Sequence, residues 1–409
     1  IISFKCSIST HSIVDLLKFN NMDVTSILDP LNAAQREAVS STDKHLLVLA
    51  GAGSGKTRVL VHRIAWLVQV ENISPHSILG VTFTNKAAKE MRGRLENMLG
   101  ASVSNMWVGT FHGLAHRLLK LHWKDAGLPQ NFQILDSDDQ LRTVKRVYRL
   151  LGIDDSKWPY RQAQSFINKQ KDDGLRSKNM PPADDPYQSI MTQIYVAYED
   201  TCVRSGMVDF GELLLRAYEL WSQNPALLCH YQQRFDQILV DEFQDTNAIQ
   251  YAWLRLLAGD SVRITAVGDD DQSIYGWRGA KVENILNFNH DYSETTTVRL
   301  EQNYRSTKNI LSAANAVISH NTDRLGKNLW TEEIEGEPIS LYASFNEHDE
   351  ARFISGTIND WVKNGGMRDE VSVLYRSNAQ SRVLEEALLR AQIPYRIYGG
   401  QKFYERQEI

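Results

Sequence analysis

The sequence predicts an α/β protein with a parallel sheet, a helical insertion and a second α/β unit, and three observations lead to this fold class. From Lys44 onward, short apolar segments alternate with segments whose apolar residues recur at helical spacing. A glycine-rich loop connects the first apolar segment to the first such helix. Between about Phe111 and Leu220 the strand patterns disappear, and charged helical sequence replaces them. Alternating strands and helices are typical of parallel sheets covered by helices.

The predicted elements follow in chain order. Strands are expected at residues 46–49, 78–83, 107–109, 237–241 and 264–268, and the first helix over residues 59–68. After Leu300 we expect the second α/β unit, with strands at 339–345 and 371–375 and a helix at 349–362 between them. The core of this unit is expected to be incomplete at Ile409.

Composition excludes several classes of protein. With 409 residues, 42% of them hydrophobic, the chain is long enough for about two to four domains. No apolar run approaches the roughly 18 residues of a membrane-spanning helix, so we expect no membrane span. Cys6, Cys202 and Cys229 lie far apart without a CxxC pair, which argues against a disulfide framework or zinc cage and favours the cytoplasm.

The net charge of −5 argues mildly against a nucleic-acid-binding protein, because such proteins usually present a basic surface. Any surface that binds a nucleic acid strand should therefore rely on local groups and on aromatic stacking in a groove.

The first 21 residues precede Met22 and do not resemble a signal peptide. We interpret residues 1–21 as a non-native extension and Met22 as the native start. The alternative is a genuine N-terminal helix, because residues 13–19 are loosely amphipathic.

A phosphate-binding loop is predicted at residues 50–57, between an apolar strand and a helix. Backbone N–H groups of such a loop surround phosphates, the lysine neutralises their charge, and the hydroxyl can bind Mg²⁺. The usual first glycine is replaced by Ala50, and the alternative is a coincidental glycine turn. The expected nucleotide-binding residues are Ala52, Gly53, Ser54, Gly55, Lys56 and Thr57.

Asp241 and Glu242 follow the strand predicted at 237–241, where the loop needs an acidic partner. Asp241 is expected to hold Mg²⁺ together with Thr57, and Glu242 to orient or deprotonate the attacking water. The alternative is an acidic strand end in a turn. A GTPase is disfavoured, because residues 85–88 lack the aspartate that would recognise guanine.

Several separated segments contain motifs in a fixed order. They are Leu31-Asn32 with Gln35, VTFTNKAA (81–88), GTFH (109–112), DEFQD (241–245), VGDDDQSIYGWRGA (267–280) and LEQNYRS (300–306). Together they resemble the motifs of superfamily-one helicases of the UvrD/Rep/PcrA type. The resemblance extends from about Met22 to Ile409, and agreement across so many segments makes chance implausible.

The resemblance implies roles at the nucleotide. Gln35 would read the adenine, with Tyr304 and Arg58 flanking it, and Arg305 would be an arginine finger reaching in from the second α/β unit. Gln272 lies just beyond the strand that ends at Gly268, so it can sense the γ-phosphate while its neighbours face DNA. For Tyr304 and Arg58 the alternatives are a buried ring and a solvated helix charge.

The resemblance also implies a DNA surface. Aromatic rings offer flat faces on which bases stack, worth about 1–3 kcal/mol each whatever the base. For any one ring, core packing is the alternative, but Trp277 lies in a polar turn. The expected DNA-binding residues are Phe83, Asn85, Phe111, His112, Tyr275, Trp277, Arg278, Arg376 and Asn378.

The family resemblance implies a domain organisation. Two RecA-like domains are expected, and a helical insertion interrupts the first. Domain 1A would comprise residues 22–110 and 216–300, insertion 1B residues 111–215, and an incomplete domain 2A residues 301–409, ending near the start of a 2B insertion.

The implied function is an ATP- and Mg²⁺-dependent 3′ to 5′ helicase and translocase that acts on single-stranded and duplex DNA in cytoplasmic DNA repair. It would meet repair proteins and work as a monomer or dimer. One alternative is a fragment that binds ATP and DNA without unwinding. Another is the motor subunit of a recombination nuclease.

Two further signals are discounted. His112 and His116 are one helical turn apart, but Gly113 stands where a zinc protease would need its glutamate. The run Asp269–Asp271 could be mistaken for a metal cluster, whereas a turn that closes a strand explains it better.

Overall fold

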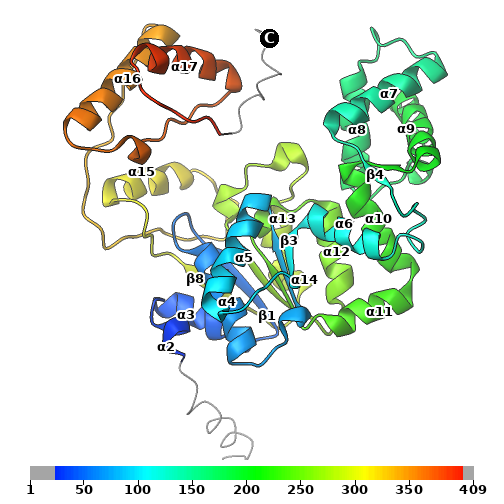
Figure 1. Ribbon diagram of the computed structural model, residues 1–409, viewed down its shortest axis with the longest axis horizontal. Coiled ribbons are helices and arrows are strands. Elements are labelled where there is room, and N and C mark those ends of the chain that lie inside the picture. The colour runs from blue at the N-terminus through cyan, green and yellow to red at the C-terminus, as the bar shows by residue number, and fades with distance from the viewer. Residues whose placement is uncertain (1–23, 399–409) are drawn as a thin grey trace, which may run out of the picture. The chain divides into compact units, whose positions relative to one another are not determined.

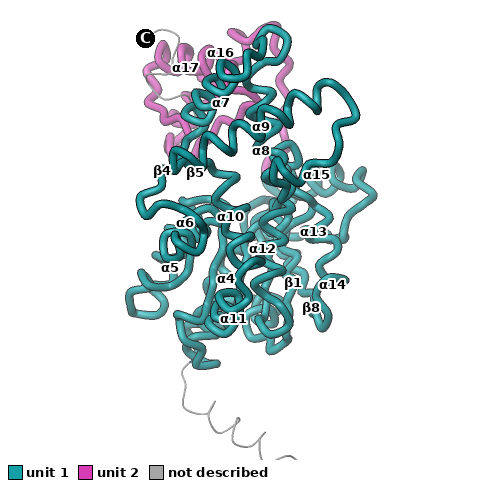
Figure 2. The backbone as a smooth tube through the Cα atoms, turned by 90° about the vertical axis from the view of Figure 1, so that its right-hand side faces the viewer, with its two compact units in different colours: residues 1–336 teal, residues 337–409 magenta. Residues whose placement is uncertain are grey.

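The computed structural model describes residues 24–398, so the predictions for residues 1–21 and Met22 lie outside the described residues. The chain forms two compact units, residues 1–336 and 337–409 (Figure 2). Within residues 24–398, none of the helices combines the length and the apolar composition that crossing a membrane requires.

A six-stranded parallel sheet forms the centre of the first unit, in the order β3-β2-β6-β7-β1-β8. β1, β2 and β6 are buried along their whole length, which explains their continuous apolar sequence. The predicted parallel α/β fold class is confirmed. The strands are β1 (His45–Ala50), β2 (Ile78–Thr82), β3 (Trp107–Thr110), β6 (Gln237–Val240), β7 (Arg263–Gly268) and β8 (Thr295–Leu300).

β8, the edge strand beside β1, is absent from the strands predicted from the sequence. Its first three residues are threonines of intermediate exposure, and only Val298 and Leu300 are buried. An edge strand packed mainly on one side does not need the continuous apolar run by which the central strands were recognised.

Helices cover both faces of the sheet (Figure 1). One face packs against α2 (Thr25–Leu28), α3 (Ala33–Ser40), α4 (Lys56–Gln69) and α5 (Asn85–Leu99). The other face packs against α6 (Phe111–Leu121), α10 (Phe210–Gln223), α11 (Pro225–Arg234), α12 (Ala248–Ala258), α13 (Glu283–Leu286) and α14 (Phe288–Asp291).

The helical insertion has a hydrophobic core of its own, made by α7 (Ser137–Leu151), α8 (Tyr160–Asp172) and α9 (Pro186–Ser205). β4 (Gln133–Ile134) and β5 (Met207–Val208) pair where the chain enters and leaves it. The insertion was predicted over residues 111–215. Its two flanking helices, α6 and α10, pack into the core beneath the sheet instead, so the separate core begins near Leu135 and ends near Met207.

The first compact unit extends past the predicted domain boundary at residues 300 and 301. Residues 301–336, including α15 (Lys308–Ile318), cluster with the first unit. Two backbone hydrogen bonds hold this segment beside β8. The Asn303 N–H donates to the Trp330 carbonyl, and the Trp330 N–H donates to the Glu301 carbonyl at 3.0 Å.

In the second unit, α16 (Glu347–Lys363) and α17 (Ser381–Arg390) pack around Ile358, Leu388 and Ile393. The strands predicted at residues 339–345 and 371–375 were wrong: neither segment forms a ladder with any described neighbour. Leu341 and Phe345 are 97% exposed. An apolar pattern produces a strand only where a partner strand supplies backbone hydrogen bonds. The helix predicted at 349–362 is present as α16.

Candidate functional site

The glycine-rich loop lies between β1 and α4, at the carboxyl edge of the sheet. Gly53 (φ 68°) and Gly55 (φ 90°) adopt the left-handed backbone conformation that favours glycine. α4 begins at Lys56, directly after Gly55, so the unpaired N–H groups of its first turn border the loop. A Cβ atom added at Gly53 would lie 2.6 Å from Asn303 Nδ2, which shows how closely the loop is enclosed.

Gln35 supports this loop from α3. Its Nε2 donates to the Ser54 carbonyl at 2.8 Å, and its Oε1 accepts from the Asn32 N–H at 3.1 Å. The side chain is 1% exposed. A glutamine amide retains one further N–H and one lone pair after these bonds. The predicted contact with adenine therefore stays a prediction, and the observed role of Gln35 is to fix the loop.

The segment after β8 is attached to the same loop. Asn303 Nδ2 donates to the Ala52 carbonyl at 2.6 Å, and the Tyr304 N–H donates to the Gly53 carbonyl at 3.0 Å. Arg305 follows, with its N–H donating to Asn303 Oδ1 at 2.8 Å. The sequence analysis placed Arg305 in the second α/β unit. In the structure it belongs to the first compact unit, because these bonds tie it to the loop.

Tyr304 and Arg58, predicted to flank the adenine, lie on one side of the loop. The Tyr304 hydroxyl accepts from Asn32 Nδ2 at 2.7 Å, and Arg58 Nη1 donates to the Pro30 carbonyl at 3.4 Å. Tyr304 is an exposed ring, which excludes the alternative of a buried one. The structure thus brings Tyr304, Arg58 and Gln35 together around the start of α3.

β6 delivers the two predicted acidic residues to this loop. Lys56 Nζ lies 3.2 Å from Glu242 Oε2, although the geometry is not that of a hydrogen bond. Glu242 adopts φ 49° and ψ 49°, a left-handed conformation that is rare outside glycine and costs conformational energy. Burial and the neighbouring Glu242 raise the pKa of Asp241 to about 7. The end of β6 and the loop thus bring a buried ammonium and two adjacent carboxylates to one place.

A chain of side-chain hydrogen bonds leads from these carboxylates to the next strand end. Gln244 Nε2 donates to Glu242 Oε2 at 2.9 Å, and Gln244 Oε1 accepts from the Asp269 N–H at 2.9 Å. Gln272, in the turn η4 (Asp270–Gln272), donates to the Asp269 carboxylate. The sequence analysis expected Gln272 to link two sites but missed Gln244, whose place inside the DEFQD motif was the available signal.

The turn after β7 contains the aspartates Asp269, Asp270 and Asp271. Lys327 Nζ lies 2.6, 2.8 and 2.7 Å from their respective carboxylates, and Arg324 pairs with Asp271. The Lys327 ammonium therefore pairs with all three carboxylates of this turn. The sequence analysis did not anticipate Lys327, which lies more than fifty residues further along the chain.

A cleft of about 440 Å³ separates the carboxyl edge of the sheet from the helical insertion. It brings together five of the residues predicted to bind DNA, and adds polar groups from the insertion and from α12. Its walls include Phe83, Phe111, His112, Tyr275 and Arg278 among the predicted residues, and Asp172, Phe210, Asp245, Asn247 and Gln250 among the others.

Three aromatic rings lie in a row, of which Phe83 and Tyr275 line this cleft. The Tyr275 ring lies 5.2 Å from that of Phe83 and 6.4 Å from that of Trp277, between centroids. The Arg278 guanidinium lies over the Tyr275 and Trp277 rings. Trp277, in the turn η5 (Gly276–Arg278), is 75% exposed, which excludes core packing for its indole. Tyr275 and Trp277 belong to the segment that Gln272 joins to the carboxylate site, whereas Phe83 follows β2.

Phe111 and His112 differ from this exposed set. The Phe111 ring is 5% exposed and lies edge-on to Trp253, so the base stacking expected for it is blocked by core packing. Burial lowers the pKa of His112 to about 4, so its imidazole is neutral at pH 7. His116 packs edge-on to Phe132. Asn85 is exposed at the first residue of α5.

Arg376 and Asn378 lie in the second unit, where both are exposed beside the turn η7 (Asn378–Gln380). The Arg376 N–H donates to Gln380 Oε1 at 3.0 Å. Their predicted contacts with the DNA backbone stay predictions.

Comparison with known proteins gives two matches to family models. Residues 31–293 match the UvrD/REP helicase N-terminal domain, and residues 298–409 match the UvrD-like helicase C-terminal domain.

Similar proteins include DNA helicase II of Escherichia coli (strain K12), 63% identical over 388 residues, which are 95% of this chain and 54% of that protein. DNA helicase II of Haemophilus influenzae is 58% identical over 392 residues, 95% of this chain and 54% of that protein. ATP-dependent DNA helicase PcrA of Leuconostoc citreum is 48% identical over 391 residues, 95% of this chain and 52% of that protein. The chain spans about half the length of these curated relatives.

Proposed function

The chain belongs to the UvrD/REP helicase family, and from that premise we propose that it contains the ATP-driven motor of a 3′ to 5′ DNA helicase. One observation carries the proposal. The Lys56–Glu242 pair at the glycine-rich loop is joined through Gln244 and Asp269 to Gln272, at the start of the segment that exposes Trp277. A nucleotide site and an aromatic surface connected in this way can influence each other.

At the nucleotide site, the loop N–H groups and Lys56 would hold the phosphates of ATP, and Thr57 and Asp241 would hold Mg²⁺. The residues fit this ligand, since the Lys56 ammonium is buried without a hydrogen-bond partner among the described residues, and a cation would relieve the crowding of the acid pair. The metal neutralises phosphate charge when bound. Glu242 would orient the attacking water.

Gln272 and Arg305 would act on the same phosphates from two other directions. Gln272 is held by Asp269 at the end of β7, and Arg305 follows the segment that is bonded to the loop. An arginine that stabilises the charge developing in phosphoryl transfer is worth about 10³–10⁵ in rate in other NTPases.

On the DNA side, Phe83, Tyr275 and Trp277 would stack on successive bases. Stacking is indifferent to base identity, as movement along any sequence requires. Asn85, His112 and Arg278 would contact the strand around these rings. Arg376 and Asn378, of the second unit, would also contact DNA. We carry over from the family resemblance the 3′ to 5′ direction, action on single-stranded and duplex DNA, a role in cytoplasmic repair with other repair proteins, and a monomeric or dimeric state.

A second candidate function is binding of ATP and DNA without unwinding. It is favoured by one observation, that the chain spans about half the length of its relatives. A duplex-unwinding assay separates the two candidates. It compares this 409-residue chain with the full-length protein encoded by the complete open reading frame. Unwinding by the 409-residue chain itself would refute the second one.

The central test is steady-state ATP hydrolysis with and without a single-stranded oligonucleotide, in the same two proteins. We expect strong stimulation by DNA, and loss of hydrolysis in Lys56→Ala and Glu242→Gln. Lys89→Ala, an exposed lysine on α5, is the matched control and should behave as wild type. The proposal would be wrong if the rate of ATP hydrolysis did not change on addition of DNA, or if the Lys56→Ala variant still hydrolysed ATP.

A further inference from the structure

Asp172, the last residue of α8, extends from the helical insertion to the sheet. Its Oδ1 accepts a hydrogen bond from Asn247 Nδ2 at 2.9 Å, and its side chain lines the cleft that also contains Tyr275 and Arg278. Asn247 belongs to the loop after β6, five positions beyond Glu242. One side chain therefore connects the insertion, the cleft and the loop that begins with the predicted catalytic carboxylate.

Asn247 is the donor in this connection, and two further hydrogen bonds fix its position. Its Oδ1 accepts from the Gln250 N–H at 3.0 Å, and its own N–H donates to Gln250 Oε1 at 3.1 Å, which completes a capping box at the start of α12. With its oxygen used in the cap, the amide nitrogen is the group left to face Asp172. A displacement of Asp172 would therefore move Asn247, the N-cap of α12, and the residues that precede Asn247 in the loop after β6.

The same loop is bonded to the segment that follows the exposed aromatic residues. Asn247 forms an antiparallel bridge with Ala280, and the Thr246 carbonyl accepts from the Lys281 N–H at 2.9 Å. Asn284 Nδ2 donates to the Thr246 carbonyl and hydroxyl, each at 3.0 Å. Residues 246–247 are thus the place where the carboxylate loop and the aromatic segment meet, and Asp172 contacts that place.

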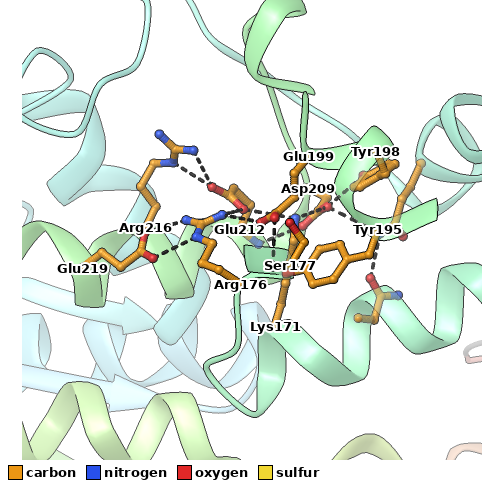
Figure 3. A network of polar contacts seen from close by, with 12 residues as sticks. Lys171, Arg176, Ser177, Tyr195, Tyr198, Glu199, Asp209, Glu212, Arg216 and Glu219 are labelled. Carbon is orange, nitrogen blue, oxygen red and sulfur yellow. Dashed lines mark hydrogen bonds and ion pairs between the residues drawn. The ribbon is translucent and has the colours of Figure 1, made fainter. Parts of the chain in front are cut away.

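The insertion holds Asp172 firmly. The neighbouring Lys171 is fully buried, with its Nζ 2.7 Å from Asp209 and 3.1 Å from Glu212. Figure 3 shows this lysine in a network in which the Arg176 guanidinium lies between Glu212 and Glu219. Because α8 is anchored to α10 in this way, the end of α8 is a fixed point against which the loop after β6 can be positioned.

We propose that Asp172 is a positioning residue that couples occupation of the cleft by single-stranded DNA to the placement of Glu242, an inference that rests on the proposed function. A strand that enters the cleft lies along the aromatic segment and beside the end of α8, which both line it. Movement of the aromatic segment is transmitted to residues 246–247 through their shared backbone bonds. With Asn247 held by Asp172, this movement turns the short loop that carries Glu242 and does not shift α12 as a whole.

The test measures the ratio of the ATP hydrolysis rate with saturating oligo(dT) to the rate without DNA. It is done at pH 8, because burial and the neighbouring Asp173 raise the pKa of Asp172 to about 7. Asp172→Ala is expected to lower this ratio by about 5-fold or more, the lower end of typical coupling between sites. The oligo(dT) concentration giving half-maximal stimulation should stay within about 2-fold of wild type, since Asp172 acts through Asn247 and not on the strand.

A reversed pair distinguishes positioning from general support of the fold. Asn247→Asp places two carboxylates face to face and should lower the ratio as Asp172→Ala does. The double variant Asp172→Asn with Asn247→Asp restores a donor and an acceptor in the opposite order and retains a good helix cap, so it should recover the wild-type ratio. Asp184→Ala, an exposed aspartate of the insertion, is the control.

The outcomes separate the two proposals. If wild-type hydrolysis is not stimulated by DNA, the proposed function fails. If wild type is stimulated and Asp172→Ala keeps the full ratio, only the positioning role fails. It also fails if the ratio falls in step with weaker oligo(dT) binding, or if the double variant folds with a wild-type melting temperature and does not recover.

Discussion

Two lysines of this protein lie beside pairs of carboxylates, and their surroundings are opposite. Lys171 is fully buried between Asp209 and Glu212, and it donates a hydrogen bond to Asp209. Lys56 lies 3.2 Å from Glu242, whose side chain is 34% exposed, and its ammonium makes no hydrogen bond with the described residues. The Lys171 ammonium thus has its hydrogen-bond acceptors within the protein. The Lys56 ammonium has none among the described residues, so its N–H groups can donate to a ligand.

The carboxylates show the same contrast. Burial alone would raise the pKa of Glu212, but Lys171, Arg176 and Arg216 lower it far below its ordinary value. Burial together with Glu242 raises the pKa of Asp241 to about 7, and Lys56 offsets this only in part. Excess positive charge around one acid indicates a structural network. Excess negative charge around the other is typical of a site that binds a cation or moves a proton.

The largest effect is expected from Arg305, which lies on the ligand side of this comparison. Arg305→Ala should lower the DNA-stimulated hydrolysis rate by about 10³–10⁵-fold, because in the proposed function Arg305 stabilises the charge that develops in phosphoryl transfer. The urea midpoint should stay unchanged, because the side chain is exposed. Steady-state ATP hydrolysis measures the rate, and urea unfolding measures the midpoint. Arg299→Ala, another exposed arginine nearby, is the control. A large loss of stability with little loss of rate would place Arg305 among the structural cations.

The two lysines can be compared directly by Lys171→Met and Lys56→Met. Lys171→Met leaves the buried Asp209 carboxylate without its cation and removes one of the three cations around Glu212, so it should cost about 3–5 kcal/mol in the free energy of unfolding. Lys56→Met should change that free energy by less than about 1 kcal/mol, because water reaches Glu242. Urea unfolding followed by circular dichroism gives both values. The reverse order would contradict the distinction between a satisfied network and an open site.

The smallest expected effect is on the pH dependence of the free energy of unfolding, to which Asp241 and Glu212 should contribute with opposite sign. The folded protein keeps a proton on Asp241 that the unfolded chain has lost, so this contribution to stability is present near pH 4 and disappears as the pH rises to about 7. The lowered pKa of Glu212 contributes stability above pH 4.5, which is lost as the pH falls below it. Each contribution is limited to about 1.4 kcal/mol per pH unit.

Urea unfolding between pH 3 and pH 7 measures this dependence. Asp241→Asn should gain stability relative to wild type as the pH rises from 4 to 7. Glu212→Gln should be less stable than wild type at pH 6, and the gap should narrow on acidification. If both variants changed in the same direction with pH, the electrostatic contrast between the site and the network would be wrong.

The parts of the molecule that depend on local sequence were predictable. A buried parallel strand needs a continuous apolar run, and a phosphate-binding turn needs glycine where φ is positive, as at Gly53 and Gly55. The strands β1, β2, β3, β6 and β7, the loop at residues 50–57 and the position of Asp241 and Glu242 follow from such local requirements. So does the exposed turn at Trp277, because glycine and arginine flank the indole in a polar segment.

Tertiary structure decided what depends on distant partners. The residues 339–345 have a strand pattern but no pairing neighbour among the described residues, and Phe111 turns out to be a core ring because Trp253 lies against it. Lys327 neutralises three aspartates, and Asp172 reaches Asn247 across 75 positions of the chain. The sequence by itself determined which groups could bind a nucleotide. Only the fold decided which charges are already paired, because pairing depends on distance in space and not on spacing along the chain.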